Sequence, residues 1–206
     1  MTLDDRGYPT GSIGYDVIAA DVLRQGDPRW SKRTLGNSAT VTIASAGCVI
    51  TSVAMACRVL GVRAGATPLD VMARGIQRPG VWAKGAAGCV VPELVRAQSG
   101  LEVGEDLPGA GAAAPTQPLR KLILEALDKG GVALVCVDTD RDAGGDVTGE
   151  HWCLATEADG DTLWLADPAT GKIESLMLRT LSGSVRWGAR TTKAYSVVRA
   201  ISVFRA

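Results

Sequence analysis

The fold of this chain is decided by residues 47–61, GCVITSVAMACRVLG, in which the segment from Cys48 to Leu60 is apolar on almost every side. A helix that is apolar all round is normally buried, and Gly61 is a typical helix stop. We therefore expect a buried central helix over residues 48–60. Because this helix begins directly after Gly47, Cys48 stands at its N-terminus.

A longer stretch without charged residues overlaps this segment and runs from residue 34 to residue 57. A membrane-spanning helix needs about 20 consecutive, mainly apolar residues, whereas this stretch is interrupted by Gly36, Asn37 and Gly47. The N-terminus shows no basic segment followed by an apolar one, which a secretory signal would have. We expect neither a membrane span nor a signal peptide, and a protein that works in the cytoplasm or is delivered outside the cell within a larger assembly.

The composition is that of a globular protein without a strongly charged surface. The 206 residues are 46% hydrophobic and 21% charged, and 22 Lys and Arg balance 22 Asp and Glu. A nucleic-acid-binding protein needs a basic face, so this balance argues against that class and against electrostatic docking on a membrane. We expect one domain over residues 21–206, preceded by a polar, glycine-rich arm at residues 1–20 that could contact an assembly partner.

Hydrophobic periodicity and turn residues predict an α+β fold. Helices come first and mainly antiparallel strands follow, with the central helix packed on a twisted antiparallel sheet. Residues 40–46 are expected to be extended, and the Gly-, Ala- and Pro-rich residues 104–118 to form an internal loop. The other predicted elements are helices at 68–74, 91–98 and 119–129, and strands at 132–137, 151–156, 162–166, 173–178 and 197–204.

The five cysteines form no recognisable disulfide or metal-binding pattern. Their number is odd and no CxxC pair is present, so we expect neither a disulfide framework nor a zinc site, and no cofactor. Cys57 and Cys136 lie within apolar runs and are expected to be buried and inert. Cys89 follows Gly88 before a short predicted helix and is the second candidate nucleophile after Cys48.

The chain contains a single histidine, His151, at the end of a polar loop and the start of a strand. Loops deliver functional groups at such positions. A thiol at a helix N-terminus faces the positive end of the helix dipole, which favours the thiolate, and a neighbouring imidazole favours it further. Any Cys–His chemistry must therefore use His151, and Cys48 is its best candidate partner.

Asp167 follows the strand that comes after a predicted hairpin turn at residues 159–161. A carboxylate on the far ring nitrogen orients a catalytic histidine. If the hairpin loop has three residues, Asp167 faces Cys153 and lies diagonally across from His151 on the same face of the sheet. A two-residue loop would put Asp167 on the other face, unless Asp167 lies beyond the paired region of the two strands. The poorer candidates for this role lie in loops or at turn tips: Glu150, Asp146 and Asp161.

An acyl-transfer enzyme also needs hydrogen-bond donors for its oxyanion. The backbone N–H of Cys48 is one candidate donor, and the side-chain amide of Gln25 is the other. A metal site formed by His151 and Cys153 is a weak alternative, because so few ligands are available. Three tryptophans are candidates for lining the substrate cleft: Trp30, Trp82 and Trp152.

Two segments of the chain resemble a known family. The segment that starts at Gln25, QGDPRWSKRTLGNSATVTIASAGCVITSVAMACRVLG, resembles the catalytic N-terminal half of the bacteriocin-processing, double-glycine-leader peptidases and their stand-alone relatives. The segment that starts at His151, HWCLATEADGDTLWLADPATG, resembles the histidine–aspartate half of that family. The resemblance implies a papain-like fold without a cofactor. It also implies that Gln25 lies in the oxyanion hole, Cys48 is the nucleophile, His151 is the general base and Asp167 orients it.

The predicted function is a cysteine peptidase that hydrolyses peptide bonds in a peptide or protein through a thioester acyl-enzyme, with Cys48, His151 and Asp167 as its triad. One alternative keeps this chemistry and changes the substrate to peptidoglycan peptides, as in phage-tail or secreted cell-wall lytic components. The other alternative is a catalytically silent structural or assembly protein on a peptidase fold.

Overall fold

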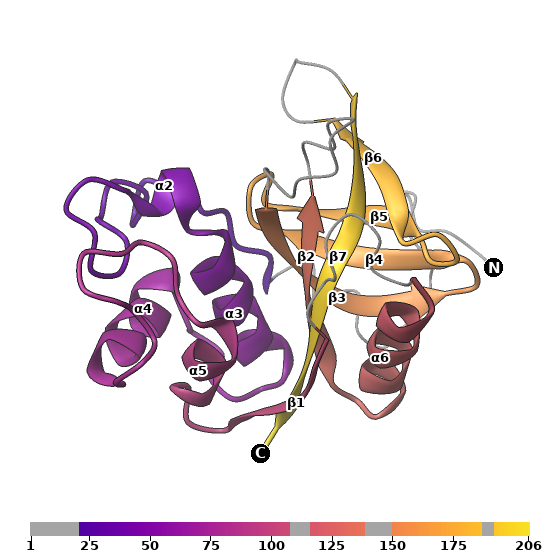
Figure 1. The fold of residues 1–206 in the computed structure, drawn as a ribbon, viewed down its shortest axis with the longest axis horizontal. Coiled ribbons are helices and arrows are strands. Elements are labelled where there is room, and N and C mark those ends of the chain that lie inside the picture. Colours follow the sequence, from indigo (N-terminus) through magenta and orange to yellow (C-terminus); the bar gives the residue numbers. More distant parts are fainter. Residues whose placement is uncertain (1–20, 108–115, 139–149, 187–191) are drawn as a thin grey trace.

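A computed structural model describes residues 21–107, 116–138, 150–186 and 192–206 of the chain. It is a mixed α/β structure in which a helical part lies beside a large antiparallel sheet (Figure 1). The predicted arm at residues 1–20 and the candidate Asp146 lie outside the described residues. In the described segments, no helix is both long and apolar enough to cross a membrane.

The helical part is built around α3 (Cys48–Val59), which confirms the helix predicted from the apolar segment. Every residue from Ile50 to Cys57 is buried, because the other helices pack on one side of α3 and the sheet packs on the other. Helix α4 (Pro68–Gln77) begins at a capping box in which Thr67 and Asp70 bond to each other's backbone N–H groups. The three smaller helices of this part are α2 (Ile43–Ala46), α4 (Pro68–Gln77) and α5 (Val91–Arg96).

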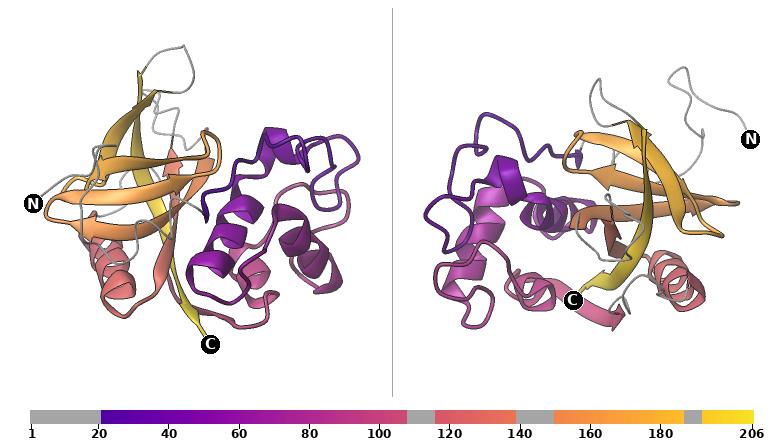
Figure 2. Two further views of the ribbon diagram at one scale, coloured as in Figure 1. Left: turned by 180° about the vertical axis from the view of Figure 1, so that it is seen from behind. Right: turned by 45° about the horizontal axis from the view of Figure 1, so that its top comes forward.

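The sheet part has seven antiparallel strands in the order β1-β7-β2-β3-β4-β5-β6, and β7 also pairs with β6. The sheet therefore closes on itself, as the two views in Figure 2 show. Closure is possible because β7 is long: its first residues pair with β6 and its later residues pair with β2 and β1. The strands are β1 (Leu101–Leu107), β2 (Val132–Asp138), β3 (Glu150–Asp159), β4 (Thr162–Asp167), β5 (Lys172–Met177), β6 (Ser182–Arg186) and β7 (Thr192–Arg205).

Two hydrophobic cores lie on opposite faces of the sheet. In β2, Leu134 and Cys136 pack with the helical part, whereas Val135 and Val137 pack on the other face with α6 (Thr116–Asp128). All of β2 is buried, because both of its faces are covered. This explains why its sequence is a continuous apolar run instead of an alternating one.

Three sequence predictions about the fold need correction, and the first concerns the sheet. The sheet is not the simple twisted one that we expected, because strand β6 and the first part of β7 close it. The segment at residues 40–46 is not extended, since it contains helix α2. Its Ile43 is fully buried, and the Ile43 carbonyl accepts the N–H of Gly47 at 2.8 Å, so the chain turns here before α3 begins.

The predicted internal loop at residues 104–118 is wrong at both ends. Residues 104–107 belong to β1 and residues 116–118 belong to α6, while residues 108–115 lie outside the described chain. A Cβ at Gly104 would lie 2.6 Å from Ser202 Oγ and from the Phe204 ring, so the close approach of β7 requires a glycine within this strand. Pro118 lies in the first turn of α6, where a missing N–H breaks no helical hydrogen bond.

Candidate active site

Cys48 is the first residue of α3, so its backbone N–H is among those that no carbonyl of the helix can accept. The start of the helix is set by Gly47, because a Cβ at this position would lie 2.6 Å from Ile43 Cγ2 and collide with the Ile43 carbonyl oxygen. The Gly47 carbonyl accepts both the backbone N–H and the hydroxyl of Thr51, at 3.0 and 2.8 Å. The backbone bond closes the first turn of α3, at whose tip the thiol lies, and the hydroxyl adds a second bond to the same carbonyl within that turn.

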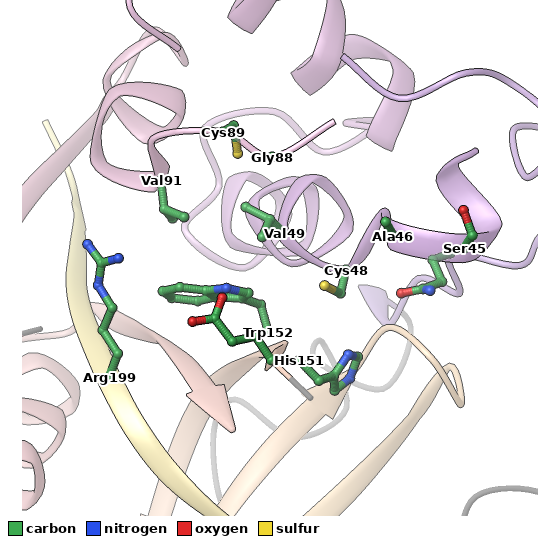
Figure 3. Close-up of a pocket in the computed structure, with 12 residues that line it drawn as sticks. Ser45, Ala46, Cys48, Val49, Gly88, Cys89, Val91, His151, Trp152 and Arg199 are labelled. Atoms are coloured by element: carbon green, nitrogen blue, oxygen red, sulfur yellow. The ribbon is translucent and has the colours of Figure 1, made fainter. Parts of the chain in front are cut away.

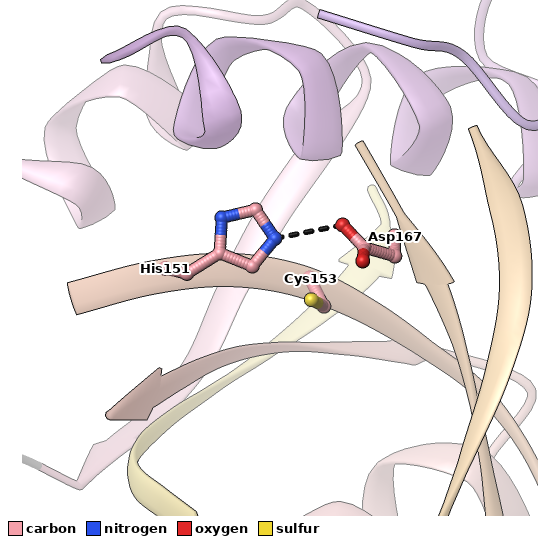
Figure 4. A group of neighbouring side chains, drawn as sticks. All are labelled: His151, Cys153 and Asp167. Atoms are coloured by element: carbon pink, nitrogen blue, oxygen red, sulfur yellow. Dashed lines mark hydrogen bonds and ion pairs between the residues drawn. The ribbon is translucent and has the colours of Figure 1, made fainter. Parts of the chain in front are cut away.

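His151 and Asp167 form a buried hydrogen-bonded pair in the sheet part. Nε2 of His151 lies 2.7 Å from Oδ1 of Asp167 (Figure 4), and the two residues are 7% and 2% exposed. Oδ1 of Asp167 also accepts the backbone N–H of Ala169 at 2.7 Å. The carboxylate is thus fixed from two sides, which orients the imidazole that it holds.

The hairpin between β3 and β4 does not have the loop length that favoured Asp167. Asp159 pairs with Thr162, so the loop has two residues. Of the two loop lengths considered from the sequence, the structure therefore has the shorter one. By parity alone, a two-residue loop would place Asp167 on the face of the sheet away from His151.

A β-bulge in β3 restores the required face. The register shifts between residues 155 and 157, which inserts one unpaired residue into β3. Beyond the bulge Leu154 pairs with Ala166, so the next residue, Asp167, comes opposite Cys153. This is the position that brings the carboxylate within reach of the histidine.

The other ring nitrogen of His151 is left for Cys48. Burial by itself lowers the pKa of His151, but the neighbouring Cys153 and side-chain hydrogen bonds with Asp167, Cys153 and Cys48 raise it well above 6.5. Because Nε2 faces Asp167, Nδ1 is the ring nitrogen that remains for a thiol. Cys48 and His151 line the same cleft, so Cys48 is the candidate partner for it.

Gln25 lies at the same place, held by contacts from both parts of the molecule. Its backbone N–H donates to the carbonyl of Pro168, in the turn after β4, at 2.7 Å. Its side-chain Nε2 donates to the carbonyl of Ala44, in α2, at 2.9 Å. An amide nitrogen carries two hydrogens, and only one of them is needed for the bond to Ala44. Gln25 and Cys48 line the same cleft.

Gln25, Cys48 and His151 line one cleft of about 440 Å³ between the helical part and the sheet. Cys48 projects into it from the helical part, and His151 and Trp152 from the sheet part (Figure 3). The charged side chains that line the cleft are Glu150 and Arg199. Both cores and both halves of the chain must therefore fold before this cleft exists.

Of the three tryptophans predicted to line the cleft, the structure brings only Trp152 there. Trp30 is 2% exposed in the core, where its Nε1 donates to the carbonyl of Arg24 at 2.9 Å, so that prediction is wrong. Trp82 lines a smaller neighbouring cavity of about 90 Å³ with Cys89. Indole rings are large enough to serve as core residues, and the sequence does not distinguish this use from cleft lining.

The other four cysteines are less suited to act as nucleophiles. Burial raises the pKa of Cys57 to about 11, of Cys89 to about 12 and of Cys153 to about 11, and it also raises the pKa of Cys136. Cys57 and Cys136 are buried, as predicted. Cys89 lines the cleft, but it lies beyond Val49, on the side away from His151 (Figure 3).

His151, Cys153 and Asp167 offer three possible metal ligands within 4.8 Å of one another (Figure 4). All three are buried, and the His151–Asp167 hydrogen bond already uses one atom of each partner. A metal at this place would have to displace that hydrogen bond and deprotonate the Cys153 thiol.

Sequence reasoning missed Arg199 and ranked Glu150 only as a poor acid. Arg199 forms a double hydrogen bond with Asp106 of β1 at 3.1 and 2.7 Å, and its guanidinium lies over the Trp152 ring at 5.6 Å. A signal was present, since Arg199 interrupts the apolar run VVRAISVF. Asp161, the remaining candidate acid, pairs instead with Arg179 near the hairpin tip.

No protein-family model matches the chain, and no curated protein gives a significant sequence match. The resemblance to the bacteriocin-processing peptidases therefore stays a prediction that depends on the residues quoted for it.

Proposed function

We propose that this protein is a cysteine peptidase or amidase with a papain-like arrangement of its helical part and closed sheet. The observation that carries the proposal is the position of His151, which bonds to Asp167 at 2.7 Å and lines the same cleft as Cys48. A nucleophile, a base and an orienting acid in contact are the requirements for activating a thiol.

The proposed reaction begins when the Cys48 thiolate attacks an amide carbonyl, forming the C–S bond and moving the carbonyl electron pair to oxygen. The Gln25 side-chain amide and the Cys48 N–H donate hydrogen bonds to this oxyanion. The intermediate collapses, the C–N bond breaks, and the imidazolium of His151 gives its proton to the leaving amine. Water then attacks the thioester while His151 takes its proton, and collapse releases the carboxylic acid and the thiolate.

The substrate class that we propose is a peptide, in line with the resemblance to leader peptidases. The cleft of about 440 Å³ combines apolar side chains at Val49 and Val91 with the two charged groups Glu150 and Arg199. This combination fits a peptide side chain with an apolar stem and a polar tip.

The test is alkylation by iodoacetamide, with the modified cysteine located by peptide mapping, in wild type, His151→Ala and Cys89→Ser. We expect Cys48 to react at least about 10-fold faster than the other four thiols in wild type, because the imidazolium stabilises its thiolate. His151→Ala should abolish this difference, while Cys89→Ser, which alters a thiol in the same cleft, should preserve it. Similar rates at all five cysteines in folded wild type, or no effect of His151→Ala, would refute the proposal. Inactivation by the mechanism-based inhibitor E-64 gives an independent check.

A further inference from the structure

One buried hydrogen bond joins the element that carries Cys48 to the element that carries His151. The hydroxyl of Ser52, in α3, donates to the carbonyl of Trp152, in β3, at 3.0 Å, although the two residues are 100 positions apart in the chain. Ser52 is fully buried and Trp152 is 5% exposed. The bond is therefore shielded from competing water. A hydrogen bond is stronger in such an interior than it is in water.

The two ends of this bond lie next to the two reacting groups. Ser52 follows Cys48 by four residues, which places both side chains on the same face of α3, one turn apart. Trp152 is the chain neighbour of His151. Any movement of α3 along β3 would change the Cys48–His151 distance and would stretch this bond by a similar amount.

Hydrophobic packing between α3 and β3 restricts their relative position less sharply than a hydrogen bond does. The contacts on either side of the bond are made by apolar side chains, and apolar burial is non-directional, so small sliding movements cost little. A hydrogen bond has a narrow range of favourable distance and angle. Proton transfer between a thiol and an imidazole requires heavy atoms within hydrogen-bond reach, so the site needs such a directional constraint.

We propose that Ser52 is a positioning residue that sets the distance between Cys48 and His151, an inference that rests on the proposed function. Its hydroxyl acts through the Trp152 carbonyl and touches neither the substrate nor the reacting atoms. The neighbouring Thr51 provides the contrast, because it is equally buried but its hydroxyl donates to the Gly47 carbonyl at 2.8 Å, within the start of the same helix. Two adjacent buried hydroxyls thus have different tasks, one within α3 and one between α3 and β3.

The experiment compares Ser52→Ala with Thr51→Val, which removes a buried hydroxyl of the same helix without crossing to β3. The readouts are the alkylation rate of Cys48 and the titration of His151 by NMR, which is unambiguous because the chain has one histidine. We expect Ser52→Ala to slow Cys48 alkylation by at least about 10-fold and to lower the pKa of His151, since it loosens the thiol–imidazole contact. Thr51→Val should change the rate by less than about 2-fold, and Ser52→Thr, which keeps the hydroxyl, should restore most of the wild-type rate.

A merely structural role for Ser52 predicts a lower melting temperature with an unchanged rate and an unchanged His151 titration, and that result would overturn the proposal. If Ser52→Ala does not fold, Ser52→Cys, a nearly isosteric replacement, is titrated by NMR instead. A His151 pKa equal to that of wild type in this variant would also overturn it. Failure of the proposed function is distinguished by the wild-type protein alone, because alkylation of Cys48 would then not depend on His151.

Discussion

The helical part and the sheet part place their reactive groups in different ways. Cys48 is placed locally, by a glycine that admits the tight approach of Ile43 and by the helix that starts one residue later. His151 and Asp167 are placed by strand register, which depends on a two-residue turn and a β-bulge several residues away from either. The nucleophile therefore needs only its own segment to be correct, whereas the histidine–aspartate pair needs two strands to be aligned.

This difference suggests that the helical part should tolerate changes elsewhere in the chain better than the sheet part does. Gln25 is the exception, because it reaches the site from the helical part while its backbone is bonded to Pro168 in the sheet part. Substitutions on the two sides test this difference.

Gln25→Met should have the largest effect, a loss of about 10²- to 10³-fold in kcat/KM for peptide hydrolysis, as expected for removal of an oxyanion donor. The alkylation rate of Cys48 should stay close to that of wild type, because iodoacetamide forms no oxyanion. Gln98→Met is the matched control, since Gln98 is a buried glutamine whose amide bonds only to backbone carbonyls of Leu94 and Val71. A parallel loss of alkylation in Gln25→Met would show that Gln25 acts on the structure around Cys48 instead.

Asp167→Asn should lower kcat/KM by about 100-fold, within the range expected for general acid–base catalysis, and should shift its pH dependence. Against the effect of burial, the neighbours of His151, including the hydrogen bond with Asp167, raise its pKa. Removing the charge of Asp167 lowers that pKa, so the basic limb of the pH–rate profile, where the imidazolium loses its proton, should move to lower pH. An upward shift, or none, would contradict the assigned pair. Asp161→Asn, near the hairpin tip, is the control and should leave the profile unchanged.

Gly47→Ala should destabilise the protein by about 1–3 kcal/mol, the usual cost of overpacking, because the added Cβ meets the fully buried Ile43. The measurement is urea unfolding, and the Cys48 alkylation rate should fall together with stability. Gly65→Ala is the matched control, since a Cβ at Gly65 meets no atom within 4 Å. Equal stabilities of the two variants would show that the start of α3 does not depend on Gly47.

Glu150→Gln should have the smallest effect, a loss of about 5-fold in kcat/KM for peptides that carry a lysine near the scissile bond, as expected for one partly solvated charge pair. Asp106 bonds to Arg199 at 2.7 Å and offsets the charge of Arg199. The exposed Glu150 is then the charged group expected to attract a cationic substrate side chain. The kinetics of matched lysine and glutamine peptides measure the effect. Glu125→Gln on the exposed face of α6 should change neither substrate, and an equal loss for both peptides in Glu150→Gln would argue against charge recognition.

The helical part of the site was predictable in more detail than the sheet part. The start of α3 at Cys48 follows from an apolar run after a glycine, and the buried states of Cys57 and Cys136 follow from the same kind of run. From the hairpin alone, the nearness of Asp167 to His151 followed only if the loop had three residues. The loop has two, and the β-bulge that brings Asp167 back to the right face has no clear sign in the sequence. Residues 104–107 were assigned to a loop because Gly104 resembles a loop glycine in the sequence. Its actual role is to admit the close approach of β7, which is far away in the chain.

By itself, the sequence determined which residues are available for chemistry: one histidine, a cysteine at a helix start, and an aspartate after a strand. Helix starts and apolar runs are local properties, so they can be read from a few neighbouring residues. Only the tertiary structure decided which of these groups meet, because strand register, sheet closure and the Ser52–Trp152 bond link segments that are distant in the chain. Such contacts depend on which side chains fit together in three dimensions, and that fit is a property of the packed molecule, not of any single segment.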